Sequence, residues 1–405
     1  MTGAKRSNNL NAWLSFGLVC GFFLFEFVSR VEPSLASQGI MKWFSISEGQ
    51  FGVLTSLFFW IYAPMQLLVG LALDRYGARR LVVPALVVCA TGPILFAITA
   101  NVYVAGLGRF LTGLGGAFGF VGALYVANHR FPARMFATLS GLVGAIGMIG
   151  TAVGLVWLSN LTDTIGWQKV FLGTGVAGFV LVVLMVLFLG KDSPAKAAPG
   201  AESPLKSLPE LLRNRRMWLI AIVSSLYYVP VNVYAGLWGK TQLEADQGLS
   251  AVSAEFTVSL VFWGLAIGGI AAGYISDRLS HRKWILTLSA LISTAFFTAV
   301  LALPSQSVTQ LSVLLFLAGF FGGPQILTFA MAKEGYPTAI AGTALAFVNM
   351  IAIGGALIFQ PAASYILQLT GGNYTTALIP VFAAPVVAAF LCLFIKEKRH
   401  SDHRP

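Results

Sequence analysis

The chain has 405 residues, of which 57% are hydrophobic and only 10% are charged, and its formal net charge is +11. Ordinary soluble domains are about 25% charged, and a soluble chain of this length could not cover its surface with so few charges. The composition excludes a water-soluble enzyme, a disordered scaffold and a nucleic-acid-binding module. It predicts an all-α integral membrane protein.

Apolar runs long enough to cross a membrane recur along the whole sequence. A transmembrane helix needs about 20 largely apolar residues. The first run contains Glu26, Arg30 and Glu32, which do not belong in the apolar core of a signal peptide, so we interpret it as a span. The sequence predicts twelve transmembrane helices, at residues 12–36, 48–73, 80–100, 103–127, 135–160, 167–189, 217–239, 252–276, 284–303, 308–332, 338–366 and 375–395.

One long polar segment separates the first six spans from the last six. Residues 190–216 are basic and rich in proline, whereas the other links are short. We therefore predict an N-terminal six-helix bundle at 1–189, a cytoplasmic linker at 190–216, and a C-terminal six-helix bundle with a cytoplasmic tail at 217–405.

The basic residues predict the orientation of the chain in the membrane. If the N-terminus is cytoplasmic, 21 of the 26 Lys and Arg residues fall in cytoplasmic segments, and Arg30 and Arg109 fall within spans. Only Lys42, Lys169 and Lys240 then lie on the outer side of the membrane. Positive residues concentrate on the cytoplasmic side of membrane proteins, so both termini are predicted to be cytoplasmic. The net charge then reflects membrane topology and contact with anionic lipid, and not nucleic-acid binding.

A motif in the first half of the chain returns in the second half. Gly70, Asp74-Arg75 and Arg79-Arg80 recur 203 residues later as Gly273, Asp277-Arg278 and Arg282-Lys283. Phe131-Pro132 and Tyr336-Pro337 match at an offset of 205. Two six-helix halves in parallel repeat are typical of transporters built around a site at the membrane midplane.

The repeated motif resembles the loop 2–3 signature of the major facilitator superfamily, and the resemblance extends over the whole chain. It implies the major facilitator fold, transport by alternating access, and a protein that usually works as a monomer. It also implies a latch, in which an Asp at a helix end pairs with Arg and holds the cytoplasmic side shut. The gating residues expected on this basis are Gly70, Asp74, Arg75, Arg79, Gly273, Asp277 and Arg278, the two glycines allowing close helix approach.

A narrower resemblance runs through the N-terminal half. Residues 25–34 (FEFVSRVEPS), 62–66 (YAPMQ) and 108–113 (GRFLTG) resemble the phagosomal transporter family of intracellular bacteria. Members of that family import amino acids or nucleosides, so the resemblance implies such a substrate and a bacterial inner membrane as the location.

Three charged residues within the predicted spans carry the proton-coupling hypothesis. Glu26 and Arg30 are four residues apart and so share a helix face, and Arg109 is the other basic residue inside a span. A charge at the bilayer centre costs about 2.5–3.5 kcal/mol on insertion scales, so such residues usually face a partner or a water-filled cavity. We expect Glu26 to take up a proton, with Arg30 and Arg109 as its partners or as contacts for an anionic substrate; a fixed structural ion pair is the alternative. Glu32, next to Pro33, is expected to be solvated.

Polar and aromatic residues of several spans are candidates for substrate binding. Span seven is the richest and is broken by Pro230, and interrupted helices of this kind can line a polar cavity. For each single residue, an interhelical hydrogen bond is an equally good interpretation. The candidates are Tyr62, Gln66, Tyr125, Ser224, Tyr227, Tyr228, Asn232, Trp263, Gln325 and Asn349.

Two glycine patterns indicate close helix packing. Gly113-x-Gly115-Gly116 lies inside an apolar run and not after a strand, so it is no nucleotide-binding loop. The ladder at 141, 144, 147, 150 and 154 is interpreted in the same way. Thr151 follows Gly150 where drug–proton antiporters of the superfamily carry a Gly-Pro step, which disfavours drug efflux.

Together these features predict a secondary transporter for proton-coupled uptake of a small polar metabolite, an amino acid or a nucleoside. The alternatives are efflux of drugs or siderophores, and exchange of organic anions or phosphate esters with Arg30 and Arg109 as the clamp. No ATP-binding motif, no paired catalytic groups and no metal-ligand spacing are found, so neither an enzyme nor a cofactor or metal site is predicted. The expected partners are the substrate, protons and the lipid bilayer.

Overall fold

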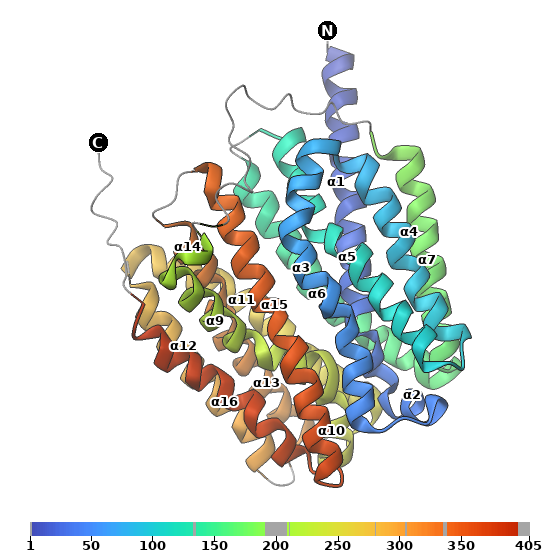
Figure 1. Ribbon diagram of the computed structural model, residues 1–405, viewed down its shortest axis with the longest axis vertical. Helices are drawn as coiled ribbons and strands as arrows, with labels where there is room; N and C mark the ends of the chain where they lie inside the picture. The colour runs from blue at the N-terminus through green and yellow to red at the C-terminus, as the bar shows by residue number, and fades with distance from the viewer. Residues whose placement is uncertain are drawn as a thin grey trace. The chain divides into compact units, whose positions relative to one another are not determined.

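The protein is built of helices (Figure 1). The computed structural model describes residues 2–132, 135–190, 209, 211–279, 281–303, 306–334 and 338–395. In these residues, twelve helical stretches are long and apolar enough to cross a membrane, and they coincide with the twelve predicted runs. The predicted all-α membrane fold is therefore confirmed. Most of the predicted linker lies outside the described residues, as does the tail from residue 396.

The chain packs as two compact units. Unit 1 comprises Met1–Ile46 and Val53–Ala197, and unit 2 comprises Ser47–Gly52 and Ala198–Pro405. The first residues of the second span thus group with unit 2, although they precede most of unit 1 in the sequence. The division of the chain into domains at 189 and 217 stays a prediction.

Unit 1 holds the first six spans. Its first span is longer than the predicted run, because α1, η1 and α2 form one stretch from Asn11 to Phe44. Helix α5 begins with Asn101, whose side chain accepts a hydrogen bond from the backbone N–H of Tyr103 at 2.8 Å, a common N-cap. The elements are α1 (Thr2–Val31), η1 (Glu32–Ala36), α2 (Ser37–Phe44), α3 (Glu48–Tyr76), α4 (Ala78–Ile98), α5 (Val102–Arg130), α6 (Phe136–Ile165) and α7 (Trp167–Phe188).

Unit 2 holds the last six spans. Its first span continues well past the predicted run and includes a π-helical segment, η3, directly after Pro230. Proline removes one backbone donor from the helical ladder, and π-helical turns are rare and occur frequently at functional sites. The elements are α9 (Arg215–Pro230), η3 (Val231–Trp238), α10 (Gly239–Gln247), α11 (Ala251–Leu279), α12 (Arg282–Ala302), α13 (Val308–Gly322), η4 (Gly323–Ile326), α14 (Leu327–Lys333), α15 (Thr338–Leu369) and α16 (Tyr374–Cys392).

Glycines bring helix backbones into contact inside each unit. A Cβ atom on Gly115 of α5 would lie 2.1 Å from the carbonyl oxygen of Ala85 in α4, and one on Gly319 of α13 would lie 2.1 Å from that of Val261 in α11. Only glycine permits such an approach. The interpretation of Gly113-x-Gly115-Gly116 as a packing motif is confirmed.

The glycine ladder of α6 is used only in part. Cβ atoms on Gly147 and Gly150 would collide with Phe23 and Leu24 of α1, whereas those on residues 141 and 144 would meet nothing within 4 Å. The predicted tight contact therefore holds at Gly147 and Gly150 and not at residues 141, 144 and 154.

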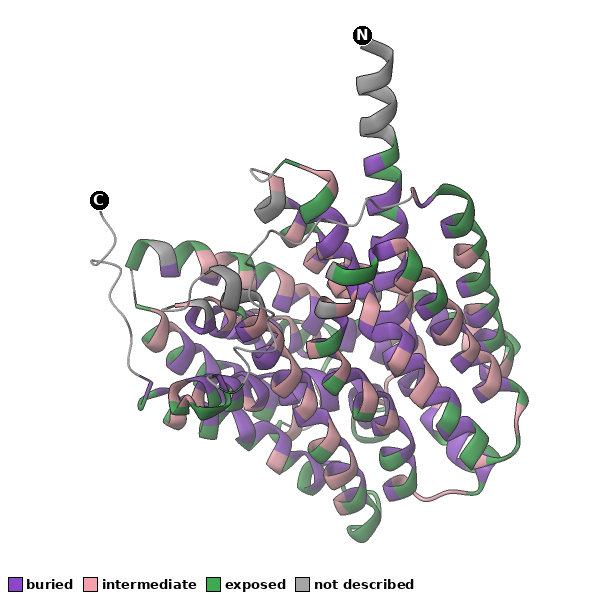
Figure 2. Ribbon diagram, turned by 45° about the horizontal axis from the view of Figure 1, so that its top comes forward, coloured by how far each residue is buried: buried purple, intermediate pink, exposed green. Residues whose placement is uncertain are grey.

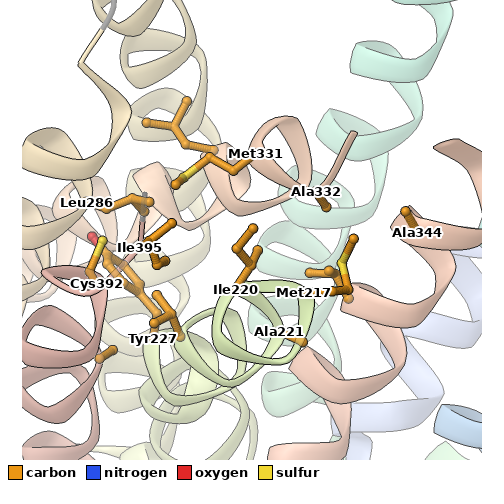
Figure 3. Packing of buried hydrophobic residues seen from close by; sticks show 14 of the residues in the cluster. Met217, Ile220, Ala221, Tyr227, Leu286, Met331, Ala332, Ala344, Cys392 and Ile395 are labelled. Carbon is orange, nitrogen blue, oxygen red and sulfur yellow. The ribbon is translucent and has the colours of Figure 1, made fainter. Parts of the chain in front are cut away.

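Burial divides most helices into an inner and an outer face (Figure 2). The outer faces carry large apolar side chains such as Leu187, Ile270 and Ile358, each at least 65% exposed, as expected for a surface in contact with lipid. Inside unit 2, Met217, Ile220 and Tyr227 of α9 pack in one cluster with Cys392 and Ile395 (Figure 3). Helix α9 is thus central to the packing of unit 2.

Candidate functional site

A buried arginine organises the end of the first helix in unit 1. Arg109 of α5 is 4% exposed, and its guanidinium donates to the carbonyl oxygens of Ser29 and Arg30, both at 2.8 Å, and to that of Thr55 at 3.4 Å. Helix α1 ends at Val31 before Pro33, so its last carbonyls lack helical partners. A cation at this position satisfies them and complements the negative end of the helix.

Glu26 and Arg30 form a buried ion pair one helical turn apart. Arg30 Nε lies 3.9 Å from Glu26 Oε1, and the two side chains are 5% and 0% exposed. This distance is too long for a hydrogen bond. Among the described residues, neither carboxylate oxygen of Glu26 nor Nε of Arg30 has a hydrogen-bond partner. The sequence prediction of a shared helix face is confirmed, but the pair is loose.

Apolar groups surround this pair. The guanidinium carbon of Arg30 lies 3.6 Å from the centroid of the Phe27 ring, a cation–π arrangement. A Cβ atom on Gly116 of α5 would lie 2.6 Å from Glu26 Cγ, so the absence of a side chain there makes room for the glutamate. Both charges are therefore held in a site with few competing donors.

Glu32 belongs to the same region, contrary to the sequence expectation. It is 1% exposed, and Thr174 of α7 donates a hydrogen bond to its Oε1 at 2.7 Å. Arg109 also acts on it electrostatically. The expectation of a solvated Glu32 is wrong because the short η1 turn after α1 directs this residue inward against α7. We call Glu26, Arg30, Glu32 and Arg109 the charged cluster.

The charged cluster contains two carboxylates and two guanidinium groups, so it is neutral when all four are ionised. Its two arginines differ in their partners. Arg109 donates hydrogen bonds to three carbonyl oxygens, whereas Arg30 forms one loose ion pair. Protonation of Glu26 would leave Arg30 without its counter-charge. An anion reaching the cluster would then find a desolvated cation with free donor capacity.

The hydroxyl and amide groups predicted to bind substrate in unit 2 largely bind one another. Gln325 Nε2 donates to Ser224 Oγ at 2.7 Å, and Ser224 Oγ lies 2.8 Å from Thr328 Oγ1. The hydroxyl of Tyr227 donates to Ser289 Oγ at 2.8 Å and to the carbonyl oxygen of Phe321 at 2.6 Å. In this structure Ser224, Gln325 and Tyr227 thus link helices, the second interpretation that the sequence left open.

The π-helical segment brings two polar side chains together. Gln360 Nε2 of α15 donates to the carbonyl oxygen of Asn232 at 3.0 Å. Within the described chain, Asn232 Nδ2 and Gln360 Oε1 are buried and have no hydrogen-bond partner. Buried polar atoms usually have partners, so this point of unit 2 retains capacity for a ligand.

The other predicted substrate residues are spread over both units. Tyr62 and Gln66 of α3 are each 2% exposed, and Tyr62 stacks on Phe58. Tyr125 of α5 stacks on His129. In unit 2, Tyr228 is buried, and Trp263 and Asn349 are half-buried.

Two of the predicted gating arginines lie at the surface. Arg75 and Arg278 are exposed and lie over the rings of Tyr76 and Tyr274. The side chains of Asp74 and Asp277 fall outside the described part of the structure, so the predicted latch stays a prediction. A Cβ atom on residue 70 or 273 would meet nothing within 4 Å, and the close approach expected at these glycines is not found.

Arg79 has a different contact. Its guanidinium donates to the carbonyl oxygens of Leu189 and, at 2.6 Å, Val186. In unit 2, Lys283 donates in the same way to the carbonyl oxygen of Leu393. One residue of the basic pair in each repeat thus caps the last helix of its own unit.

Three charged groups in unit 2, Glu334, Lys240 and Glu255, were not predicted as site residues from the sequence. Glu334 forms ion pairs with Arg216, at 3.2 Å, and with Arg282. The signal available in the sequence was the presence of an acidic residue, Glu334, just after a predicted span. Lys240, predicted to lie on the outer side of the membrane, is in α10 and is 4% exposed. Glu255 of α11, on which Lys240 acts electrostatically, is 1% exposed.

Relatives of the chain are transporters, which agrees with the prediction of a transporter and not an enzyme. It is 23% identical to a probable sulfoacetate transporter of Cupriavidus necator, over 75% of each chain. It is 24% identical to the cis,cis-muconate transport protein of Acinetobacter baylyi, over 94% of this chain and 95% of that one. These relatives do not confirm the phagosomal family or an amino-acid or nucleoside substrate.

A solved structure and a family match agree with the fold. The structure of the nucleoside transporter NupG superposes with a TM-score of 0.79, at 14% identity, over 95% of this chain and 100% of that one. At this identity the likeness concerns the fold alone. Residues 14–246 and 226–405 each match the Major Facilitator Superfamily.

Proposed function

The chain belongs to the major facilitator superfamily and is a multi-pass membrane transporter of small molecules, and on this premise we propose that it carries small organic acid anions. The observation that carries the proposal is the incomplete pairing of the buried Arg30 guanidinium. The guanidinium is paired with one carboxylate at 3.9 Å and is without a hydrogen-bond partner at Nε among the described residues. Guanidinium groups bind carboxylates through paired hydrogen bonds, so Arg30 is the group expected to receive the substrate's carboxylate.

The relatives support an acid over the other substrate classes. Sulfoacetate and cis,cis-muconate, the substrates named for two of them, both carry a carboxylate and a second acidic group. A nucleoside carries no carboxylate and gives Arg30 no anionic partner.

We propose in addition that uptake is coupled to protons through Glu26. Its carboxylate competes with the substrate for Arg30, and a proton on Glu26 removes this competition. Substrate and proton would then enter together, and both would leave when Glu26 pairs with Arg30 again. In proteoliposomes with an imposed proton gradient, Glu26→Gln should lose gradient-driven accumulation and keep counterflow exchange.

Uptake by proteoliposomes tests the substrate class. The wild type would be offered labelled dicarboxylates, a sulfonated acetate, aromatic acids, amino acids and nucleosides. We expect transport of the acids, a loss of at least tenfold in Arg30→Gln, and little change in Lys169→Gln, which removes the same charge from an exposed position of unit 1. Transport of nucleosides but no acid, or equal rates in both variants, would overturn the proposal.

The cytoplasmic latch and the cytoplasmic termini remain part of the proposal. The repeated Asp74-Arg75 and Asp277-Arg278 pairs and the distribution of basic residues support them. If Asp74→Asn changes neither the transport rate nor the balance of inward-open and outward-open protein, the latch is wrong. Protease accessibility of a tag at each terminus, in right-side-out and inverted vesicles, tests the orientation.

A further inference from the structure

A second buried carboxylate lies in unit 2, apart from the charged cluster in the chain. Glu255 is in the second turn of α11 and is 1% exposed. Among the residues described, neither of its carboxylate oxygens has a hydrogen-bond partner. An ionised carboxylate removed from water and without donors is costly, and such a group commonly takes up a proton instead.

Two hydroxyl groups near Glu255 along α11 are used elsewhere. Thr257 Oγ1 donates to the carbonyl oxygen of Ser253 at 2.7 Å, and Ser259 Oγ donates to that of Phe256 at 2.6 Å. Each bond returns to the backbone of the same helix. The helix that carries Glu255 therefore gives its carboxylate no hydroxyl donor from these positions.

The charges that act on Glu255 come from α10. Lys240 attracts the ionised carboxylate and Glu244 repels it. Lys240 is itself 4% exposed, and its Nζ lies 3.9 Å from Glu244 Oε1. Lys240 thus pairs with Glu244 and also acts electrostatically on Glu255, and the three groups carry a net charge of −1 when all are ionised. A single proton on Glu255 makes them neutral.

Among the described residues of the neighbouring elements, no other charged group is found to act on Glu255. Helix α13 contains no titratable side chain, and the hydroxyl of Tyr234 in η3 donates to Gln242 at 3.0 Å. Helix α12 begins with Arg282 beside Ser276, at the far end of α11. Of the described residues, Lys240 and Glu244 are therefore the charged groups that act on Glu255.

We propose that Glu255 is a second proton-binding site, independent of Glu26, in which the proton decides whether Lys240 is shared with Glu255 or left to Glu244. A metal cation is disfavoured, because no group of three or more His, Cys, Asp or Glu residues in the described chain could hold one. This site goes beyond the proposed transport of organic acids. It does not depend on that proposal.

Infrared difference spectroscopy of the purified protein tests the site without any substrate. The carbonyl band of protonated carboxyl groups would be recorded across a pH series for the wild type, Glu26→Gln and Glu255→Gln. We expect each variant to lose a separate part of the pH-dependent band, and the double variant to lose both. An unchanged band in Glu255→Gln would overturn the proposal, and so would a band that responds to sodium and not to pH.

Glu244→Gln provides a milder second variant, because Glu244 is partly exposed, with 31% of its side chain accessible. This change removes the repelling charge and frees Lys240 for Glu255, which favours the ionised carboxylate. At a fixed pH the part of the band assigned to Glu255 should therefore weaken, while the part assigned to Glu26 stays the same. A band that strengthens or does not change would contradict the shared-lysine arrangement.

Discussion

The two units have related helix packing and very different polar interiors. Both bring helices together through glycines that contact backbone, as at Gly115 in unit 1 and Gly319 in unit 2. Both use a basic residue of the repeated loop, Arg79 or Lys283, to cap their last helix. The repeat has thus kept the contacts that hold the helices.

The buried chemistry is not repeated. Unit 1 concentrates formal charges where α1 ends, in the charged cluster. In unit 2, α9 presents neutral groups such as Ser224 and Tyr227, and the buried charges of Lys240 and Glu255 lie beyond the π-helical segment. We therefore propose that unit 1 supplies the ion-binding groups used in transport, whereas unit 2 supplies neutral polar contacts and a separate titratable group.

The largest effect is expected from the loss of Arg109, which tests the charged cluster of unit 1. Arg109→Leu leaves three carbonyl oxygens without their donor and Glu32 without a cation. Leaving a buried charge uncompensated costs about 3–5 kcal/mol, and Arg109 acts electrostatically on the buried Glu32. The free energy of unfolding in mixed micelles should fall by this amount, and uptake should be lost. A stability equal to that of the wild type would show that Arg109 does not hold the end of α1.

The shared packing gives the next effect. Gly115→Ala and Gly319→Ala each place a methyl group against backbone, and overpacking of this kind costs about 1–3 kcal/mol. The two variants should lose similar stability in the same unfolding measurement. Gly141→Ala is the control, because nothing lies within 4 Å of its Cβ position. If only one of the two packing variants is destabilised, the units are not built alike.

The hydrogen bonds among Ser224, Gln325 and Thr328 in unit 2 should contribute less to the free energy of unfolding. Ser224→Ala removes the group between Gln325 Nε2 and Thr328 Oγ1, and interhelical hydrogen bonds in membranes average about 0.6 kcal/mol. A double-mutant cycle with Thr328→Ala should give a coupling energy of this size. Uptake in Ser224→Ala should stay within a few-fold of wild type. A loss as large as that of Arg30→Gln would mean that Ser224 contacts the substrate.

The smallest effect is expected at the helix caps. Arg79→Gln and Lys283→Gln each remove a cation from a helix C-terminus, a contribution of about 0.3–1 kcal/mol. Both variants should show a similar, small loss of stability that does not depend on substrate. A change in the balance of inward-open and outward-open states in Arg79→Gln alone would instead support its predicted gating role.

The fold was predictable because its signal is local. About 20 apolar residues suffice to identify a span, so the twelve helices follow from the sequence. The pairing of Glu26 with Arg30 is equally local, because residues four apart share a helix face. The ends of long spans were not predictable in this way. Helix α10 continues the seventh stretch to Gln247 with polar residues, whereas the predicted run ends at residue 239.

The candidate site depends on contacts that no local pattern contains. Glu32 is buried by Thr174, which is 142 residues away in the chain. The bonds of Ser224 and Tyr227 join helices separated by at least 62 residues in sequence. A hydroxyl in a span has the same local signature whether it binds a ligand or a neighbouring helix, so only the tertiary structure separates the two.

Substrate binding by Arg30 and Glu26 variants tests the central claim most directly. The affinity of the purified protein for a transported organic acid would be measured by titration calorimetry in the wild type, Arg30→Gln and Glu26→Gln. Because the substrate and Glu26 compete for Arg30, the account predicts that binding is lost in Arg30→Gln and is retained or tightened in Glu26→Gln. Equal loss of affinity in both variants would mean that the two residues form a fixed structural pair, and would contradict the account.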